Sequence, residues 1–323
     1  GVITATQFMS NTEYALYETG SGLTVQGNEF RWNQRGIYLR AATAGHAALG
    51  GNVFENNWGS ALWTDLAGML LLDGTNGFVN NVGNAVLVES GTLNQSATMY
   101  SGTVYLLNDL AVSSGVTLTI QSNVVIKFRS SGSSLDVHGT LNAQGTSDNP
   151  VVFTSLKDDT YGGDTNNDGT TTSPARGDWY EIDIGGSATF NHTIIRYGGA
   201  SQYHYYFDAM ISNSGSLSIS NSTIAYSGWK GIYHYGGSLT IHNSNIYGHS
   251  SYGIYNADTS ITINAENNWW GSDSGPAPYG SGNGINYRTC WDPVLKVNYI
   301  CQFYVDADPW IGQSTFVGGQ MGQ

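Results

Sequence analysis

Residues 215–257 contain the same sequence pattern twice, at a spacing of 22 residues. Gly215-Ser-Leu-Ser-Ile-Ser-Asn-Ser-Thr-Ile returns as Gly237-Ser-Leu-Thr-Ile-His-Asn-Ser-Asn-Ile, and Gly231-Ile-Tyr returns as Gly253-Ile-Tyr. A fixed period of this length is typical of arrays in which each repeat buries its apolar face on its neighbours. Within each copy, apolar residues alternate with polar ones and stop at Asn, Ser or Gly. This pattern predicts short strands joined by turns, as in one coil of a parallel β-helix.

A second form of the repeat occupies residues 21–90, with a spacing of 24 residues. Its members are Asn28, Asn52 and Asn76; Phe30, Phe54 and Phe78; and Asn33, Asn57 and Asn81. Stacking by one period places like residues about 4.8 Å apart, which predicts Phe stacks inside and Asn ladders at the turns. Asn tolerates the left-handed backbone conformation, so we expect these Asn residues to adopt it at the bends.

These periods predict an all-β chain, a single-stranded parallel β-helix of about a dozen coils of 22–24 residues. We divide it into N-terminal coils and a junction (1–101), continuing coils (102–285), and a C-terminal cap with two cysteines and a flexible tail (286–323). The period breaks at 91–101, and residues 156–178 form the one long loop.

Charge composition argues against two classes of partner. The chain has 323 residues, with 11 Lys and Arg against 24 Asp and Glu, and a formal charge of −13. With so few basic residues and no basic run, we expect it to bind neither nucleic acid nor anionic membranes. No apolar run is long enough to span a bilayer, and Met69-Leu-Leu-Leu72 is at most a core strand. Because the chain starts at Gly1 without Met, we expect either a processed product or an excised fragment of a secreted protein, with any signal peptide already removed.

Cys290 and Cys301 are the only cysteines. We favour a disulfide that closes a terminal loop, which fits an extracellular location. Two unrelated small core residues remain the alternative. A zinc site would need further ligands, and no His lies nearby in the sequence.

Two motifs carry a resemblance to a known group of proteins. They are Asn267-Asn-Trp-Trp-Gly-Ser-Asp-Ser-Gly-Pro, and Gly115-Val-Thr-Leu-Thr-Ile with Phe153-Thr-Ser, Gly162-Gly-Asp and Gly177-Asp-Trp. Over roughly residues 20–310 the chain resembles the right-handed parallel β-helix modules of large secreted bacterial and archaeal surface proteins, relatives in fold of the pectate-lyase-like superfamily. The resemblance implies a right-handed fold and a surface location. It implies no reaction, because such modules occur in adhesins, stalks and carbohydrate-processing enzymes.

The long loop contains a candidate calcium site. Asp164, Asn166 and Asp168, followed by Gly169, have the spacing of oxygen ligands in a calcium loop. Position 175 is Ala where the closing Glu of such a loop would stand. The shell would therefore have to be completed by other acids, namely Asp158, Asp159 or Asp178. The alternative is a solvated turn with scattered acids. We expect that no cofactor is required. Calcium, if bound, would order the loop without taking part in catalysis.

The acidic and basic residues do not form a recognisable active site in the sequence. A polysaccharide lyase needs carboxylates beside a basic residue, and a glycosidase needs acids on neighbouring coils. The basic residues Lys157, Arg176 and Arg196 form no row at one-coil spacing, and the acids Asp178, Glu181 and Asp183 are close in sequence instead. We therefore expect no enzymatic activity.

Aromatic residues are dense between 197 and 255 and could form a row that binds sugar rings. The candidates are Tyr203, Tyr205, Tyr233 and Tyr255. The alternative is ordinary packing, because Tyr is favoured on sheets.

We expect an extracellular structural subunit that self-associates end to end into a filament or stalk. Uncapped array ends expose unpaired strands. The expected junction strands are Val2, Ile3 and Phe8 at the start and Phe316 and Val317 in the tail. The alternative, from a different class, is a β-helix that binds or degrades a polysaccharide.

Overall fold

The computed structural model describes residues 1–20, 22–40, 48–201 and 208–312. This part of the chain is nearly all-β, with 35 short strands in six sheets and one four-residue helix. Five of the sheets are parallel and the sixth is an antiparallel hairpin. Because the single described helix has four residues, no described helix could cross a membrane. The predicted residues Tyr203, Tyr205, Phe316 and Val317 lie outside the described residues.

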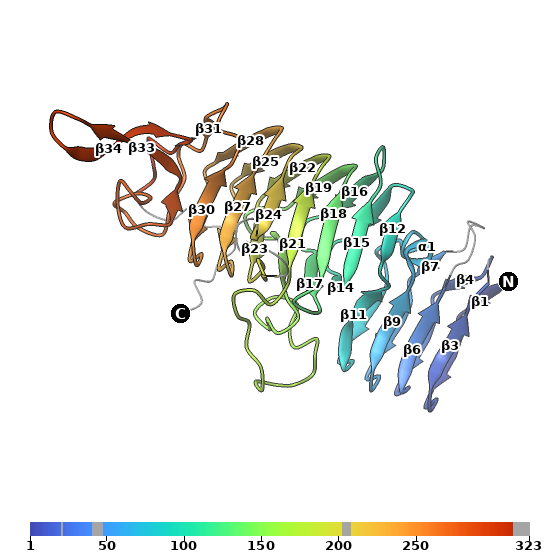
Figure 1. Cartoon of the computed structure of the whole chain (residues 1–323). Helices are drawn as coiled ribbons and strands as arrows, with labels where there is room; N and C mark the ends of the chain where they lie inside the picture. Colours follow the sequence, from blue (N-terminus) through green and yellow to red (C-terminus); the bar gives the residue numbers. More distant parts are fainter. Residues whose placement is uncertain (21, 41–47, 202–207, 313–323) are drawn as a thin grey trace.

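The longest sheet, here sheet 1, extends from one end of the molecule to the other (Figure 1). Its strands are β3 (Tyr14–Glu18), β6 (Arg35–Leu39), β9 (Ser60–Thr64), β11 (Gly83–Val88), β14 (Val104–Leu107), β17 (Val125–Phe128), β20 (Val151–Ser155), β23 (Thr193–Arg196), β26 (Thr223–Ala225) and β29 (Asn245–Tyr247).

Two further parallel sheets accompany sheet 1 after residue 90. Sheet 2 contains β12 (Gly91–Leu93), β15 (Asp109–Val112), β18 (Ser134–Val137), β21 (Glu181–Ile184), β24 (Ala209–Asn213), β27 (Lys230–His234), β30 (Tyr252–Asn256) and β32 (Gly284–Ile285). Sheet 3 contains β13 (Ala97–Met99), β16 (Thr117–Ile120), β19 (Thr140–Gln144), β22 (Ser187–Asn191), β25 (Ser216–Ser220), β28 (Ser238–His242), β31 (Ile263–Asn264) and β35 (Val305–Asp306). Three successive strands, one from each sheet, make one repeat, and the chain then returns to sheet 1.

The first part of the chain follows the same cycle with two other sheets. Sheet 4 contains β2 (Gln7–Met9), β5 (Glu29–Arg31), β8 (Val53–Glu55) and β10 (Gly77–Val79), and sheet 5 contains β1 (Val2–Thr4), β4 (Thr24–Gln26) and β7 (Leu49–Gly50). Helix α1 (Leu66–Met69) begins at Asp65, whose carboxylate accepts the backbone N–H of Gly68. The expectation of a core strand at 69–72 is therefore corrected: Met69 ends the helix, and only Leu72 forms a β-bridge, to Leu49.

The strand registers confirm both predicted periods. Leu217 pairs with Leu239 at the 22-residue step, and Phe30, Phe54 and Phe78 align at the 24-residue step. The rings of Phe30 and Phe54 stack with centroids 5.0 Å apart and are fully buried. The chain is thus an all-β array of long parallel sheets, an arrangement compatible with a parallel β-helix.

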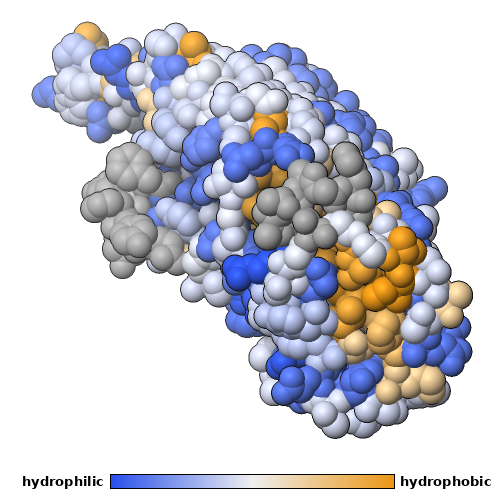
Figure 2. Space-filling model, turned by 90° about the vertical axis from the view of Figure 1, so that its right-hand side faces the viewer, coloured by the Kyte–Doolittle hydropathy of each residue, from blue (hydrophilic) through white to orange (hydrophobic). Residues whose placement is uncertain are grey.

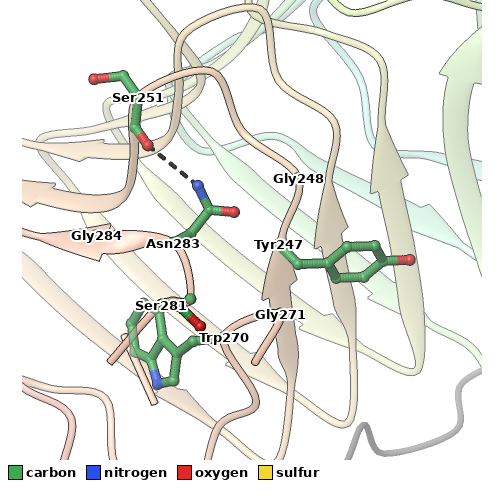
Figure 3. Close-up of a pocket in the computed structure, with 9 residues that line it drawn as sticks. Tyr247, Gly248, Ser251, Trp270, Gly271, Ser281, Asn283 and Gly284 are labelled. Atoms are coloured by element: carbon green, nitrogen blue, oxygen red, sulfur yellow. Dashed lines mark hydrogen bonds between the residues drawn. The ribbon is translucent and has the colours of Figure 1, made fainter. Parts of the chain in front are cut away.

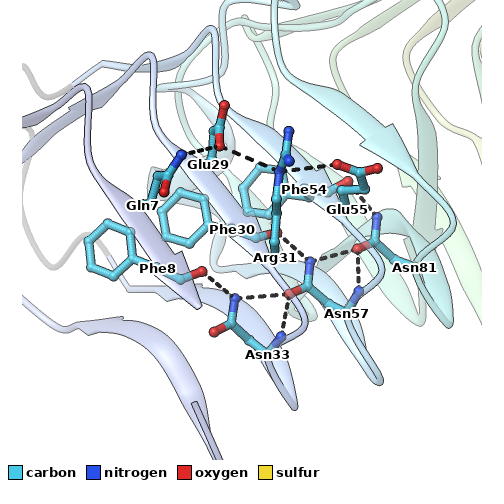
Figure 4. Close-up of polar contacts among 10 residues, drawn as sticks. All are labelled: Gln7, Phe8, Glu29, Phe30, Arg31, Asn33, Phe54, Glu55, Asn57 and Asn81. Atoms are coloured by element: carbon cyan, nitrogen blue, oxygen red, sulfur yellow. Dashed lines mark hydrogen bonds and ion pairs between the residues drawn. The ribbon is translucent and has the colours of Figure 1, made fainter. Parts of the chain in front are cut away.

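The predicted Asn ladders are present, with one correction to their backbone conformation. Asn57 receives hydrogen bonds from the backbone and side-chain amides of Asn33, and itself donates to Asn81 and to the Phe30 carbonyl (Figure 4). The ladder residues are not the left-handed ones. For five of the six the residue before carries the positive φ, such as Trp32 (52°) before Asn33 and Asn56 (54°) before Asn57, whereas for Asn76 it is Gly74 (78°), two residues before. The preceding residue makes the bend, and the Asn that follows points inward to satisfy the buried backbone amides.

One apolar core runs the length of the array, from Val25 to Ala307. In β16 the inward residues Leu118 and Ile120 are fully buried, whereas their neighbours on the outer face are half-buried. Sheet 1 differs, because β17 and β20 are buried on both faces. Its outer apolar residues are covered by side chains from the long loop, including Leu156 and Tyr161.

Candidate functional site

The long loop, residues 156–178, leaves β20 and returns at β21, and it projects from the side of the array (Figure 1). A buried ion pair fastens its first turn to sheet 1. The guanidinium of Arg196 on β23 donates from Nε and Nη2 to the two carboxylate oxygens of Asp158, at 2.8 and 2.7 Å. The hydroxyl of Thr154 also donates to this carboxylate. Asp158 is fully buried, so this fork is the fixed base of the loop.

Two more contacts hold the loop. Lys127 on β17 is fully buried, and its Nζ donates to the carbonyl of Gly163 at 2.5 Å. Burial lowers the pKa of Lys127 to about 8, against the opposing effect of nearby carboxylates, Asp158 first. At the end of the loop, Asp178 accepts from the Lys157 ammonium (2.7 Å) and the Ser155 hydroxyl (2.8 Å). Asp158 and Asp178 therefore serve as anchors of the loop.

Between these anchors, three carboxylates converge. Oxygens of Asp159, Asp164 and Asp168 lie within 4.8 Å of one another. Asp164 accepts the backbone N–H groups of Asp168 and Gly169, which closes the turn at the loop tip. Burial, followed by the charge of Asp164, raises the pKa of Asp159. The structure thus brings the two acids of the Asp164–Asp168 motif together with Asp159, while Asp158 and Asp178 engage other partners.

Sheet 2 carries a second group of acids that the periodic pattern did not reveal. Asp136 on β18 and Asp183 on β21 are directly in register, and Glu181 lies on the same face. Burial raises the pKa of Glu181 to about 7, even though the Ser212 hydroxyl donates to it at 2.6 Å. Sequence reasoning missed Asp136 because the long loop separates β18 from β21 and interrupts the period. A carboxyl with such a pKa can exchange protons at neutral pH, but the sequence predicted no basic residue on a neighbouring coil to act with Glu181.

A pocket of about 550 Å³ opens beyond these acids at the C-terminal end of sheet 2. The predicted residues Tyr233 and Tyr255 stand in register on β27 and β30, with ring centroids 6.0 Å apart, and both line it. Three further tyrosines line the same pocket: Tyr252, Tyr287 and Tyr304. Asn256 also contributes, and its Oδ1 is buried without a hydrogen-bond partner among the described residues.

A shallower pocket of about 390 Å³ lies beside the Asn-Asn-Trp-Trp-Gly segment (Figure 3). Much of its wall is the backbone of glycines such as Gly248 and Gly271. Its amide side chain, Asn283, donates to the carbonyls of Ser251 and His249, and the ring of Tyr247 points away from Asn283 in Figure 3. The polar groups of Asn283 therefore hold a turn in place, and we assign no ligand to this pocket.

The two ends of the array are also distinctive. At the N-terminal end apolar residues gather at the surface (Figure 2). Val2 on β1 is 71% exposed, and Phe8 on β2 stacks on Phe30. At the other end, the antiparallel hairpin β33 (Tyr287–Asp292) and β34 (Val297–Phe303) projects from the body (Figure 1). The disulfide between Cys290 and Cys301 crosses this hairpin. Its surface includes large exposed apolar residues: Trp291, Val294, Leu295, Val297 and Tyr299.

Comparison of the chain with models of protein families, with curated proteins and with solved structures finds no match.

Proposed function

We propose that the chain is a right-handed parallel β-helix and an extracellular structural subunit that assembles end to end with further copies of itself. The observation that carries this proposal is the open N-terminal end of the parallel sheets. Strands β1, β2 and β3 each have a described partner strand on one side only. At the opposite end β35 is the last described strand of its sheet, whereas Trp269 bridges Asn245 beyond β29 and the backbone N–H of Ile285 on β32 donates to Ala277. Unpaired strand edges are templates for pairing with another chain.

The N-terminal edge offers both apolar area and unused hydrogen-bond acceptors. Phe8 presents one ring face to the edge, because its other face covers Phe30 at 4.7 Å. Within the ladder, each Asn donates to the Oδ1 of the next one along the chain, so Asn11 donates to Asn33. In the described part of the chain nothing donates to the Oδ1 of Asn11. A strand from another molecule, placed ahead of β1–β3, would cover the Phe8 ring and could donate a hydrogen bond to the Oδ1 of Asn11.

A second copy is the occupant that fits this edge best. The strands at both ends belong to parallel sheets of the same array, and sheet 1 is continuous between them. Translation of one copy along the array therefore presents parallel strands to parallel strands. Such a head-to-tail contact does not close on itself, so it generates a filament. The exposed apolar hairpin at the C-terminal end would add contact area to the same junction.

The test is electron microscopy and sedimentation of the wild-type chain, Phe8→Asp and a matched control, Val79→Asp. Val79 is an apolar residue, 45% exposed, that lies on β10 away from the terminal edge. We expect rods longer than one molecule for the wild type and the control, and single short particles for Phe8→Asp. A wild-type chain that stays monomeric at its highest soluble concentration would refute assembly.

The tyrosine pocket favours a second candidate function, the binding of a neutral glycan. Tyrosine rings stack on the apolar faces of sugar rings, and the unpartnered Oδ1 of Asn256 would accept a hydrogen bond from a sugar hydroxyl. Titration of a panel of neutral oligosaccharides by calorimetry tests this proposal. We expect Tyr255→Ala to abolish binding and Tyr299→Ala, an exposed tyrosine of the hairpin, to leave it unchanged. Failure of the whole panel to bind would remove this candidate.

A further inference from the structure

We propose that the tip of the long loop binds one calcium ion, held by carboxylates of Asp159, Asp164 and Asp168 with oxygen ligands from Thr165 and Asn166. The proposal is independent of assembly and of glycan binding. It starts from the geometry of the three carboxylates, whose oxygens lie within 4.8 Å of one another. Ca²⁺ takes six to eight oxygen ligands at about 2.3–2.6 Å, so one ion can contact oxygens at this separation.

An independent observation points to a ligand. Four side-chain oxygens in this loop are buried and receive no hydrogen bond from the described residues: Asp159 Oδ1, Thr165 Oγ1, Asn166 Oδ1 and Asp168 Oδ1. Thr165 is only 5% exposed, so solvent has little access to its hydroxyl. A buried acceptor without a partner costs about 1–3 kcal/mol, and such groups are rare in folded proteins. Four of them in ten residues of one loop indicate a missing common partner.

Several amide and backbone donors in the loop already have other partners, which leaves oxygen lone pairs toward the site. The amide nitrogen of Asn166 donates to Asp168 Oδ2 (2.7 Å), and this turns its Oδ1 away from that contact. The backbone N–H groups of Asp168 and Gly169 both go to Asp164. A group that satisfies the remaining atoms must therefore be positively charged or a multiple donor.

The charge of the site fits a divalent cation. Three carboxylates converge, and one ammonium, that of the buried Lys127, acts on Asp159 and Asp164 from the side of sheet 1. The sum is two negative charges, which one Ca²⁺ neutralises. An all-oxygen ligand set excludes a structural zinc site, which takes Cys or His ligands. Mg²⁺ demands near-ideal octahedral geometry and keeps its water, so a site with several protein oxygens favours Ca²⁺.

The ion would couple two parts of the loop. Asp159 follows the anchored Asp158, whereas Asp164 and Asp168 close the turn at the tip. Binding would therefore fix the tip against the fork on Arg196, and the loop would become more resistant to proteolysis between residues 159 and 178.

The experiment is calorimetric titration of the full chain with Ca²⁺ after chelation, together with thermal unfolding. The variants are Asp168→Asn and Asp164→Asn, and the control is Asp148→Asn, an exposed acid outside the loop that makes the same change in charge. We expect wild type and control to bind one Ca²⁺, to unfold at higher temperature with it, and to bind Mg²⁺ at least tenfold more weakly. Both loop variants should bind Ca²⁺ at least tenfold more weakly, and Asp168→Asn should match the wild-type melting temperature in chelator.

Three results would overturn the proposal. They are the absence of heat and of any melting shift at millimolar Ca²⁺, equal affinities for Asp168→Asn and the control, and equal responses to Ca²⁺ and Mg²⁺. The last would identify diffuse counterion binding by an acidic chain. Limited proteolysis gives a second readout, because cleavage within 159–178 should slow with Ca²⁺ in the control and not in Asp168→Asn.

Discussion

Replacing one interior rung of the Asn ladder measures how strongly the bends hold the array. Asn57 is 1% exposed and accepts from the backbone N–H and the Nδ2 of Asn33, both at 3.0 Å (Figure 4). Asn57→Ala removes this acceptor and leaves two N–H bonds of Asn33 unsatisfied: the backbone one and one of the two on Nδ2, whose other hydrogen still bonds the Phe8 carbonyl. At about 1–3 kcal/mol for each orphaned group, partly relieved by water entering the gap, the free energy of unfolding should fall by about 3 kcal/mol.

The first rung is the matched control. Asn11 donates its amide to Asn33 and is half-buried, and none of the described residues donates to its Oδ1. Asn11→Ala orphans no donor, so it should cost about 1 kcal/mol or less. Equilibrium urea unfolding, followed by fluorescence and circular dichroism, gives both values if the two probes coincide. Equal losses for the two variants would refute the reasoning, because burial of orphaned donors would then not decide the cost.

A charged variant, Asn57→Asp, tests whether position 57 must donate hydrogen bonds as well as accept them. Asn57→Asp keeps the acceptor for Asn33, but it faces a carboxylate toward two other acceptors, the Phe30 carbonyl and Asn81 Oδ1. We expect it to be at least as destabilising as Asn57→Ala at pH 7. It should recover as the pH falls through the raised pKa of the new carboxyl, because the protonated form can donate again.

Three further predictions concern charges and the hairpin. Burial raises the pKa of Glu181 from 4.5 to about 7, so its ionisation lowers the stability of the fold as the pH rises through this interval. Glu181→Gln should therefore stabilise the fold by about 1–3 kcal/mol at pH 8 and have little effect at pH 4. Urea unfolding at the two pH values measures both effects. Arg196→Met strands the buried charge of Asp158 and should cost about 3–5 kcal/mol, with part of the loss regained on acidification. Reducing Cys290–Cys301 should speed hydrogen exchange within residues 287–303 and leave the parallel sheets unchanged, whereas faster exchange throughout would contradict a separate hairpin.

The parts of this structure that follow a period could be predicted from sequence, and the parts that interrupt it could not. The alignment of Leu217 with Leu239, and of Phe30 with Phe54, follows from spacing alone because each repeat stacks on its neighbour. Spacing also identified the ladder residues, although not that the left-handed residue of the bend lies one or two positions before each of them. The pairing of Asp136 with Asp183 was hidden, because an inserted loop has no fixed length and destroys the count between two neighbouring strands.

Breaks in the repeat period also explain why the hairpin and the change of sheets were not predicted. The antiparallel hairpin lies between β32 and β35, so it inserts into a repeat, and its strands have no counterpart one period away. The change from sheets 4 and 5 to sheets 2 and 3 comes after β10, the last strand of sheet 4, and before β12. Helix α1, which precedes β10, is too short to show a helical period. Local sequence predicted that the pattern changes near residue 91. It carried no information on which strands would pair after the change.

The same division between period and interruption bears on function. In an array each repeat contacts its neighbours, so a change in one repeat alters stability locally. The long loop, the tyrosine pocket and the terminal edge lie in different repeats, at β20–β21, at β27–β32 and at β1–β3. Removing calcium should therefore change protection of the loop and of β17, β20 and β23 beneath it, while filament formation and sugar binding are unaffected. If chelation of calcium dissolved the filaments, the terminal edge and the loop would have to be coupled through more than a hundred intervening residues. Contacts between neighbouring repeats alone would then not explain the stability of this fold.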